Sequence, residues 1–129
     1  MFDKHKTILI IEDSATQALH LQAHLRREGV EAICAWDGVV GVNMAYQVRP
    51  DLIVLDLHLP RMNGIEVCEK LRSGALTKDI IIVAISGVHD PALGKRVLDA
   101  GADLFFTKPF DMMSFRDECL ALLHSPRAR

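Results

Sequence analysis

Several kinds of segment are missing from this chain of 129 residues. Only five prolines and eight glycines are present, which argues against a linker or a collagen-like protein. The longest apolar run lies near Ile80–Ile85 and is far too short to span a membrane. Lys and Arg number 15 against 17 Asp and Glu, so the net charge is −2. Because nucleic-acid-binding proteins are usually basic, we expect no direct nucleic-acid binding.

Cysteine is scarce as well. The three cysteines, Cys34, Cys68 and Cys119, form no Cys-x-x-Cys pair, so we expect buried small side chains, with a disulfide or a metal ligand as the minor alternative. The N-terminus has no secretory apolar region, and we expect a cytoplasmic protein with no membrane contact. No Gly-x-Ser-x-Gly motif and no P-loop is present, which argues against serine hydrolases and nucleotide hydrolases.

The composition is that of an ordinary globular protein. Half of the residues are hydrophobic and a quarter are charged. The length suits one domain, and neither a linker nor a shift in composition divides the chain. We therefore expect one domain over residues 5–125, a frayed tail over residues 126–129 and no output domain in this chain.

Five short β-like runs alternate with helical patterns. Four of the five are nearly continuous apolar residues, as in parallel strands that are covered on both faces. The expected strands are Thr7–Ile11, Glu31–Trp36, Leu52–Leu57, Ile80–Ile85 and Leu104–Thr107. Five strand–helix repeats predict an α/β fold with a parallel sheet and right-handed crossovers.

Helix start and stop signals fill the segments between these strands. Ser14–Gln17 has a capping-box pattern, and Gly29 is expected to stop the first helix. The third helix is expected over Gly64–Ser73. Further N-caps are expected at Asp37, Asp90 and Asp111, the last of which starts a helix to about His124.

The carboxyl ends of the expected strands gather polar residues. Glu12 and Asp13 follow the first strand, and Asp56 lies within the third. Ser86 follows the fourth strand and Lys108 the fifth. In open parallel sheets this edge binds ligands. Asp56 is the most informative of these residues, because a charge inside an apolar strand is costly unless it is paired or binds a metal.

The charges at this edge predict a hard-metal site. Three carboxylates and one lysine sum to −2, and two carboxylates about 4 Å apart repel by about 4 kcal/mol at an effective dielectric near 20. Oxygen ligands suit Mg²⁺, with Mn²⁺ as an alternative. This set of carboxylates, lysine and hydroxyl fits phosphoryl transfer to Asp56. In that reaction the metal and Lys108 neutralise phosphoryl oxygens, and Ser86 binds one of them in the product.

Several short segments follow one another in a specific order and spacing. They are Ile8–Asp13, Asp51–Asp56, Leu59–Pro60 with Asn63–Gly64, Ile85–Gly87, Gly101–Asp103 and Thr107–Phe110. Together they resemble the response-regulator receiver domain, a CheY-like family, over about Lys6 to Leu123. The resemblance implies a flavodoxin-like (βα)5 doubly wound fold with the strand order 2-1-3-4-5.

The resemblance also implies roles for the site residues. Asp56 would be the phosphoacceptor and would take its phosphoryl group from a histidine kinase or a histidine phosphotransfer protein. Asp13, Asp56 and the backbone carbonyl of His58 would hold Mg²⁺ directly, and Glu12 would do so through water. Lys108 would precede a cis peptide bond to Pro109.

The resemblance further implies that output would follow from a shift in the populations of two conformations of the domain. Ser86 and Phe105 would move inward on phosphorylation and change the face of the fourth helix, fifth strand and fifth helix. Phe105 has no hydroxyl, unlike the Tyr often found there, so its movement can exchange burial but no hydrogen bond. The partner that recognises this face would be a downstream protein or an output domain outside this chain, with a homodimer through that face as an alternative.

Rival functions are less well supported. An aspartate-nucleophile phosphatase would carry its nucleophile on the first strand, and an FMN binder would need hydroxyls where Glu12 and Asp13 stand. A receiver-like interaction or dimerisation module with little phosphotransfer is the open alternative. Beyond its own phosphorylation and slow autodephosphorylation, we expect no enzymatic activity. His20 and His24 have a metal-binding spacing but no evident third ligand, so we expect a solvated face.

Overall fold

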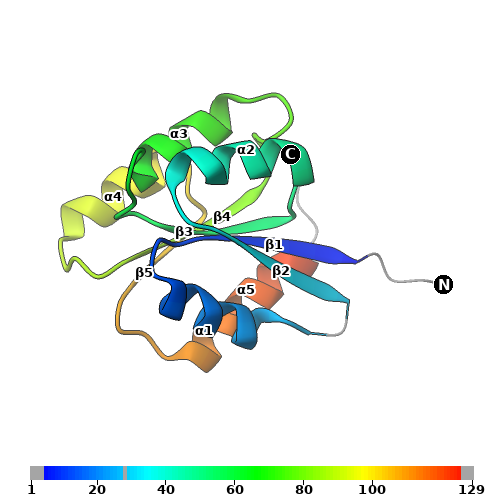
Figure 1. Cartoon of the computed structure of the whole chain (residues 1–129). Helices are drawn as coiled ribbons and strands as arrows, with labels where there is room; N and C mark the ends of the chain where they lie inside the picture. The colour runs from blue at the N-terminus through cyan, green and yellow to red at the C-terminus, as the bar shows by residue number, and fades with distance from the viewer. Residues whose placement is uncertain (1–4, 28, 126–129) are drawn as a thin grey trace.

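A parallel five-stranded sheet lies between two layers of helices (Figure 1). The computed structural model describes residues 5–27 and 29–125. The strands are β1 (Lys6–Ile11), β2 (Val30–Ala35), β3 (Leu52–Asp56), β4 (Ile81–Ser86) and β5 (Leu104–Thr107). The helices are α1 (Ala15–Leu25), α2 (Gly38–Val48), α3 (Gly64–Ser73), α4 (Pro91–Asp99) and α5 (Met112–His124). The order β2-β1-β3-β4-β5 confirms the expected topology.

Each face of the sheet has its own apolar core. Helices α1 and α5 cover one face, and α2, α3 and α4 cover the other (Figure 1). Strands β3 and β4 are buried along their whole length, as expected for parallel strands covered on both faces. Cys68 lies in one core and Cys119 in the other, where burial raises the thiol pKa to about 11 and about 12 respectively. All three cysteines are free; Cys68 and Cys119 are buried as expected, whereas Cys34 is only half-buried.

The register of the sheet aligns the strand ends that carry the polar residues. Ile11 of β1 lies opposite Leu55 of β3, so Glu12, the next residue, comes beside Asp56. Ser86 of β4 lies opposite Thr107 of β5, and the Lys108 N–H donates to the Ser86 carbonyl at 2.7 Å. Parallel pairing thus brings together residues that are up to 96 positions apart.

Element bounds differ from the expected ones by small shifts. β5, α3 and the end of α5 lie where expected. Ile80 falls outside β4 because its N–H donates to the Thr77 carbonyl in a turn. Leu57 falls outside β3, where the His58 N–H turns back to the Asp56 carboxylate. Trp36 falls outside β2, next to the α2 N-cap Asp37.

The start of α1 corrects one expectation. Ser14 caps the helix by accepting from the Gln17 N–H, but the reciprocal bond of a capping box is replaced: the Ser14 N–H donates to Glu12 and the Gln17 carboxamide oxygen accepts from Lys108. A full capping box forms instead at α3, between Asn63 and Glu66, where it was not foreseen.

Two further expectations concern the chain ends and the end of α1. The helix stops at Leu25, earlier than Gly29, which has a φ of 81° in the turn before β2. The tail expected over residues 126–129 lies outside the described residues. Among residues 5–27 and 29–125, no helix has the length and apolar character needed to cross a membrane.

Gly64 packs α3 tightly against the end of β3, and this contact is testable. A Cβ at Gly64 would lie 2.5 Å from the Leu57 Cα and 2.7 Å from the Asp56 carbonyl oxygen, and backbone atoms cannot move aside cheaply. We expect Gly64→Ala to lower the free energy of unfolding by roughly 1–3 kcal/mol, measured by urea unfolding. Gly87→Ala is the control, because a Cβ there meets no atom within 4 Å. Equal losses in both variants would contradict this packing.

Candidate functional site

Asp56 is a buried carboxylate at the end of the central strand β3. Only 4% of the residue is exposed. Its Oδ1 accepts from the His58 N–H at 2.7 Å, and its Oδ2 accepts from the Lys108 ammonium at 2.8 Å. Because a buried charge is stable only when it is paired and hydrogen-bonded, these two contacts explain how the strand tolerates the carboxylate.

Lys108 joins three elements through its ammonium group. Nζ donates to Asp56 Oδ2, to Glu12 Oε1 at 3.2 Å and to Gln17 Oε1 at 2.5 Å. Burial lowers the pKa of Lys108, but hydrogen bonds and charge from Asp56 and Glu12 outweigh it and raise the pKa above its usual value. Lys108 is therefore a firmly charged group, and the peptide bond from it to Pro109 is cis, as expected.

Glu12 is the second buried carboxylate of the site. It is 1% exposed, and its Oε2 accepts from the Ser14 N–H at 3.1 Å. Burial, followed by a hydrogen bond and charge from Asp56, raises the pKa of Glu12 to about 7. Lys108 and the Ser14 N–H oppose this rise only in part. The raised pKa indicates that the Lys108 ammonium does not fully compensate Glu12 for its burial and for the neighbouring Asp56.

The other expected site residues are Asp13, His58 and Ser86 at the strand ends and Phe105 within β5, three residues before Lys108. Asp13 and His58 are exposed beside Glu12 and Asp56 in the chain. Ser86 is fully buried, and its Oγ accepts from the Val88 N–H at 3.0 Å. Phe105 is half-buried and packs against α4, where a Cβ added at Gly94 would lie 3.1 Å from the ring.

The metal expectation can be compared with the donor set. Among the described residues, no three or more His, Cys, Asp and Glu side chains form a group that could hold a metal; Lys108 instead bridges Glu12 and Asp56. The chemistry of the donors nevertheless fits a hard cation, because the carboxylate oxygens of Glu12, Asp13 and Asp56 outnumber the positive charge beside them. A ligand set that also uses a backbone carbonyl and water stays a prediction.

Comparison with known protein families identifies the family of this chain. The family model for the response regulator receiver domain matches residues 8–119. The chain belongs to the receiver domain family. Response regulator ArlR of Staphylococcus aureus strain MW2 is 40% identical over 116 residues, which are 90% of this chain and 52% of ArlR. The receiver chain thus spans about half the length of the curated relatives that it matches.

Solved structures carry the same fold. The receiver domain of a DNA-binding response regulator from Colwellia psychrerythraea 34H aligns with a TM-score of 0.87 and 26% identity, over 93% of this chain and 99% of that one. The receiver domain of a signal transduction histidine kinase from Syntrophus aciditrophicus aligns with a TM-score of 0.83 and 34% identity, over 92% and 89%. The expected receiver fold is confirmed, and this chain is a receiver domain of two-component signalling.

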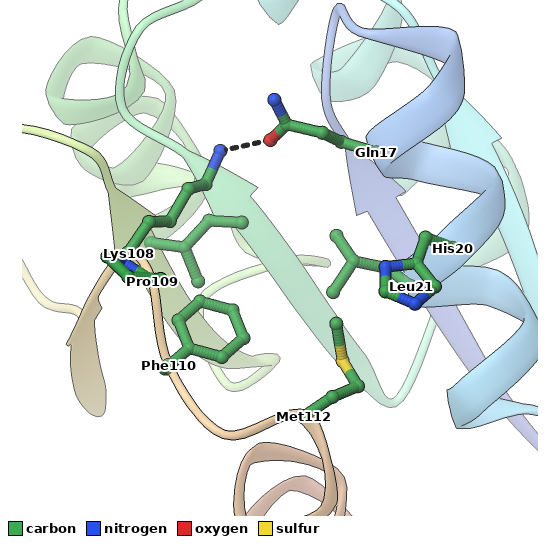
Figure 2. Close-up of a pocket in the computed structure, with 8 residues that line it drawn as sticks. Gln17, His20, Leu21, Lys108, Pro109, Phe110 and Met112 are labelled. Carbon is green, nitrogen blue, oxygen red and sulfur yellow. Dashed lines mark hydrogen bonds between the residues drawn. The ribbon is translucent and has the colours of Figure 1, made fainter.

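The receiver has a cavity beside Lys108 that the sequence did not indicate. It measures about 280 Å³ and lies between α1 and the segment from β5 to α5 (Figure 2). Its lining consists of Gln17, His20, Leu21, Ile85, Lys108, Pro109, Phe110 and Met112. His20 is exposed and His24 is half-buried, with ring centroids 4.7 Å apart. Gln17, an exposed residue in a helical pattern, gave no signal that it would reach Lys108.

The raised pKa of Glu12 predicts a pH-dependent stability. The pKa of Glu12 is about 7 in the folded receiver, against 4.5 for the unfolded chain. The stability that the protonated Glu12 carboxyl contributes is therefore full below pH 4.5 and is lost as the pH rises through 7. We expect Glu12→Gln to exceed the wild type in free energy of unfolding at pH 8, by up to about 3 kcal/mol, and by much less at pH 5.

Urea unfolding in EDTA-containing buffer measures this difference. Glu69→Gln is the matched control, since Glu69 is exposed on α3, and we expect no such pH dependence from it. A Glu12→Gln variant whose difference from the wild type is the same at pH 5 and pH 8 would refute the assignment.

Proposed function

We propose that this receiver is a phosphoacceptor of a His-Asp phosphorelay, in which Asp56 takes a phosphoryl group from a phosphohistidine donor. The observation that carries the proposal is the buried Asp56 carboxylate paired at 2.8 Å with the Lys108 ammonium, at the carboxyl edge of the sheet. A histidine kinase or a histidine phosphotransfer protein would supply the donor. Relatives named as response regulators support this class of partner.

The residues present supply the chemistry of the transfer. A carboxylate oxygen of Asp56 attacks phosphorus, a P–O bond forms, and the donor P–N bond breaks with its electron pair left on the imidazole. Lys108 lies where it can neutralise charge on the phosphoryl oxygens. Ser86, whose Oγ accepts from the Val88 N–H, retains a hydroxyl proton that it can donate to a phosphoryl oxygen after the β4–α4 segment moves.

The oxygen donors of the site fit Mg²⁺, with Mn²⁺ as an alternative. Asp13, Asp56 and the backbone carbonyl of His58 would be direct ligands, and Glu12 would act through water. When bound, the cation supplies the positive charge that lets an anionic donor approach two buried carboxylates.

The route from the site to the surface runs along β4 and β5. Lys108 directly follows β5, and Phe105 within that strand packs against α4. A cavity of about 260 Å³, lined by His89, Asp90, Pro91, Phe105 and Thr107, gives the Phe105 ring space to move. Movement of Ser86 and Phe105 would change the α4-β5-α5 face, which a downstream protein, an output domain or a second copy of the chain would read.

Intact-mass measurement tests the phosphoacceptor directly. With acetyl phosphate and Mg²⁺ we expect a gain of one phosphoryl group that hydroxylamine removes, because an acyl phosphate is labile to that nucleophile. The gain should be absent without Mg²⁺ and in Asp56→Asn. Asp99→Asn is the matched control, since Asp99 is exposed on α4, and it should behave like the wild type.

The same measurement distinguishes the phosphoacceptor from the alternative function, an interaction module with little phosphotransfer. A wild type that gains no mass from acetyl phosphate or from a phosphorylated histidine phosphotransfer protein, although it binds Mg²⁺, would contradict the proposal. The receiver would then be an interaction or dimerisation module with little phosphotransfer.

A further inference from the structure

The Lys108 ammonium has as many acceptors as it has protons. An ammonium group can donate three hydrogen bonds, and Nζ donates to Asp56, Glu12 and Gln17. Gln17 is the only uncharged acceptor of these three. It belongs to α1, and Figure 2 shows its carboxamide oxygen directed at Nζ. In this state Lys108 has no proton left for a further acceptor.

The three acceptors differ in what it costs to release them. The side chains of Asp56 and Glu12 are 6% and 2% exposed and carry charge, so losing Lys108 would leave a buried carboxylate poorly compensated. Gln17 is neutral and exposed, so water can replace Lys108 at its oxygen. Hydrogen bonds between two charged groups are also stronger than those with a neutral partner. Gln17 is therefore the acceptor that Lys108 releases most easily.

We propose that Gln17 is a positioning residue that holds Lys108 in the resting receiver and is exchanged for a phosphoryl oxygen when Asp56 is phosphorylated. This inference rests on the proposed function. As the Asp56 O–P bond forms and the bond from phosphorus to the leaving group breaks with its electron pair, a phosphoryl oxygen accepts the Lys108 hydrogen bond that Gln17 accepted in the resting state. No proton changes owner in this exchange.

The cavity beside Lys108 gives the released side chain a place to go. Gln17 lines it together with His20 and Phe110 (Figure 2). Because the contact exists in the resting state and is broken at the transition state, it stabilises only the ground state and slows phosphorylation. The phosphorylated receiver lacks the contact, so autodephosphorylation is independent of it.

A pair of Gln→Met variants tests the exchange. Gln17→Met keeps the length and helix propensity of the side chain but removes the acceptor, and Gln47→Met makes the same change at an exposed position of α2. With acetyl phosphate and Mg²⁺, we expect Gln17→Met to be phosphorylated roughly two- to tenfold faster than the wild type, in keeping with the loss of one hydrogen bond. Its autodephosphorylation rate and both rates of Gln47→Met should stay unchanged.

Slower or unchanged phosphorylation of Gln17→Met would overturn the exchange, as would an equal change in both rates. A second measurement examines the contact without any phosphorylation. In ¹⁵N NMR of the resting receiver, we expect the Lys108 ammonium protons to exchange with water several times faster in Gln17→Met than in the wild type.

The two measurements fail in distinguishable ways. Unchanged ammonium exchange would overturn the Gln17 contact itself. A wild type that is never phosphorylated would instead overturn the proposed function, and the exchange step with it, even if ammonium exchange responds to Gln17→Met as expected.

Discussion

The ammonium of Lys108 lies between two carboxylates that the fold buries, Asp56 and Glu12. Each carboxylate would be costly in the interior without a cation or a proton, and the raised pKa of Glu12 shows that one ammonium does not fully meet this cost. The register of the five-stranded sheet brings Asp56, Glu12 and Lys108 together from the ends of strands that are distant in sequence. Under the proposed function, a cation would complete the compensation of these buried carboxylates and allow an anionic phosphoryl group to approach them.

Much of this arrangement can be read from the residues because burial and charge conflict in the sequence itself. Asp56 stands out in a strand of apolar residues, and parallel topology then requires that Glu12, Ser86 and Lys108 share its edge. The five strands and the helix caps at Asp37, Asp90 and Asp111 follow from apolar runs and local hydrogen-bonding preferences. The strand order within the sheet is implied by the resemblance to the receiver family.

What escaped prediction depends on tertiary contacts. Ser14 and Gln17 have the spacing of a capping box, but the Lys108 cation competes for the Gln17 oxygen and takes it. The capping box of Asn63 and Glu66 is an exception, because it is local and the Asn-x-x-Glu spacing could have predicted it. The Gly64 contact with the end of β3 depends on how closely α3 approaches that strand, which a one-dimensional pattern does not contain.

A crystal structure of the receiver with Mg²⁺ and beryllofluoride, a tetrahedral mimic of a phosphoryl group on a carboxylate, tests the central claim most directly. We expect beryllium bonded to an Asp56 oxygen, with Lys108 Nζ and Ser86 Oγ each donating to a fluorine and Gln17 released from Lys108. Beryllofluoride bound away from Asp56, or bound there while Lys108 keeps all three of its resting acceptors, would contradict the claim that this charged cluster is built to receive a phosphoryl group.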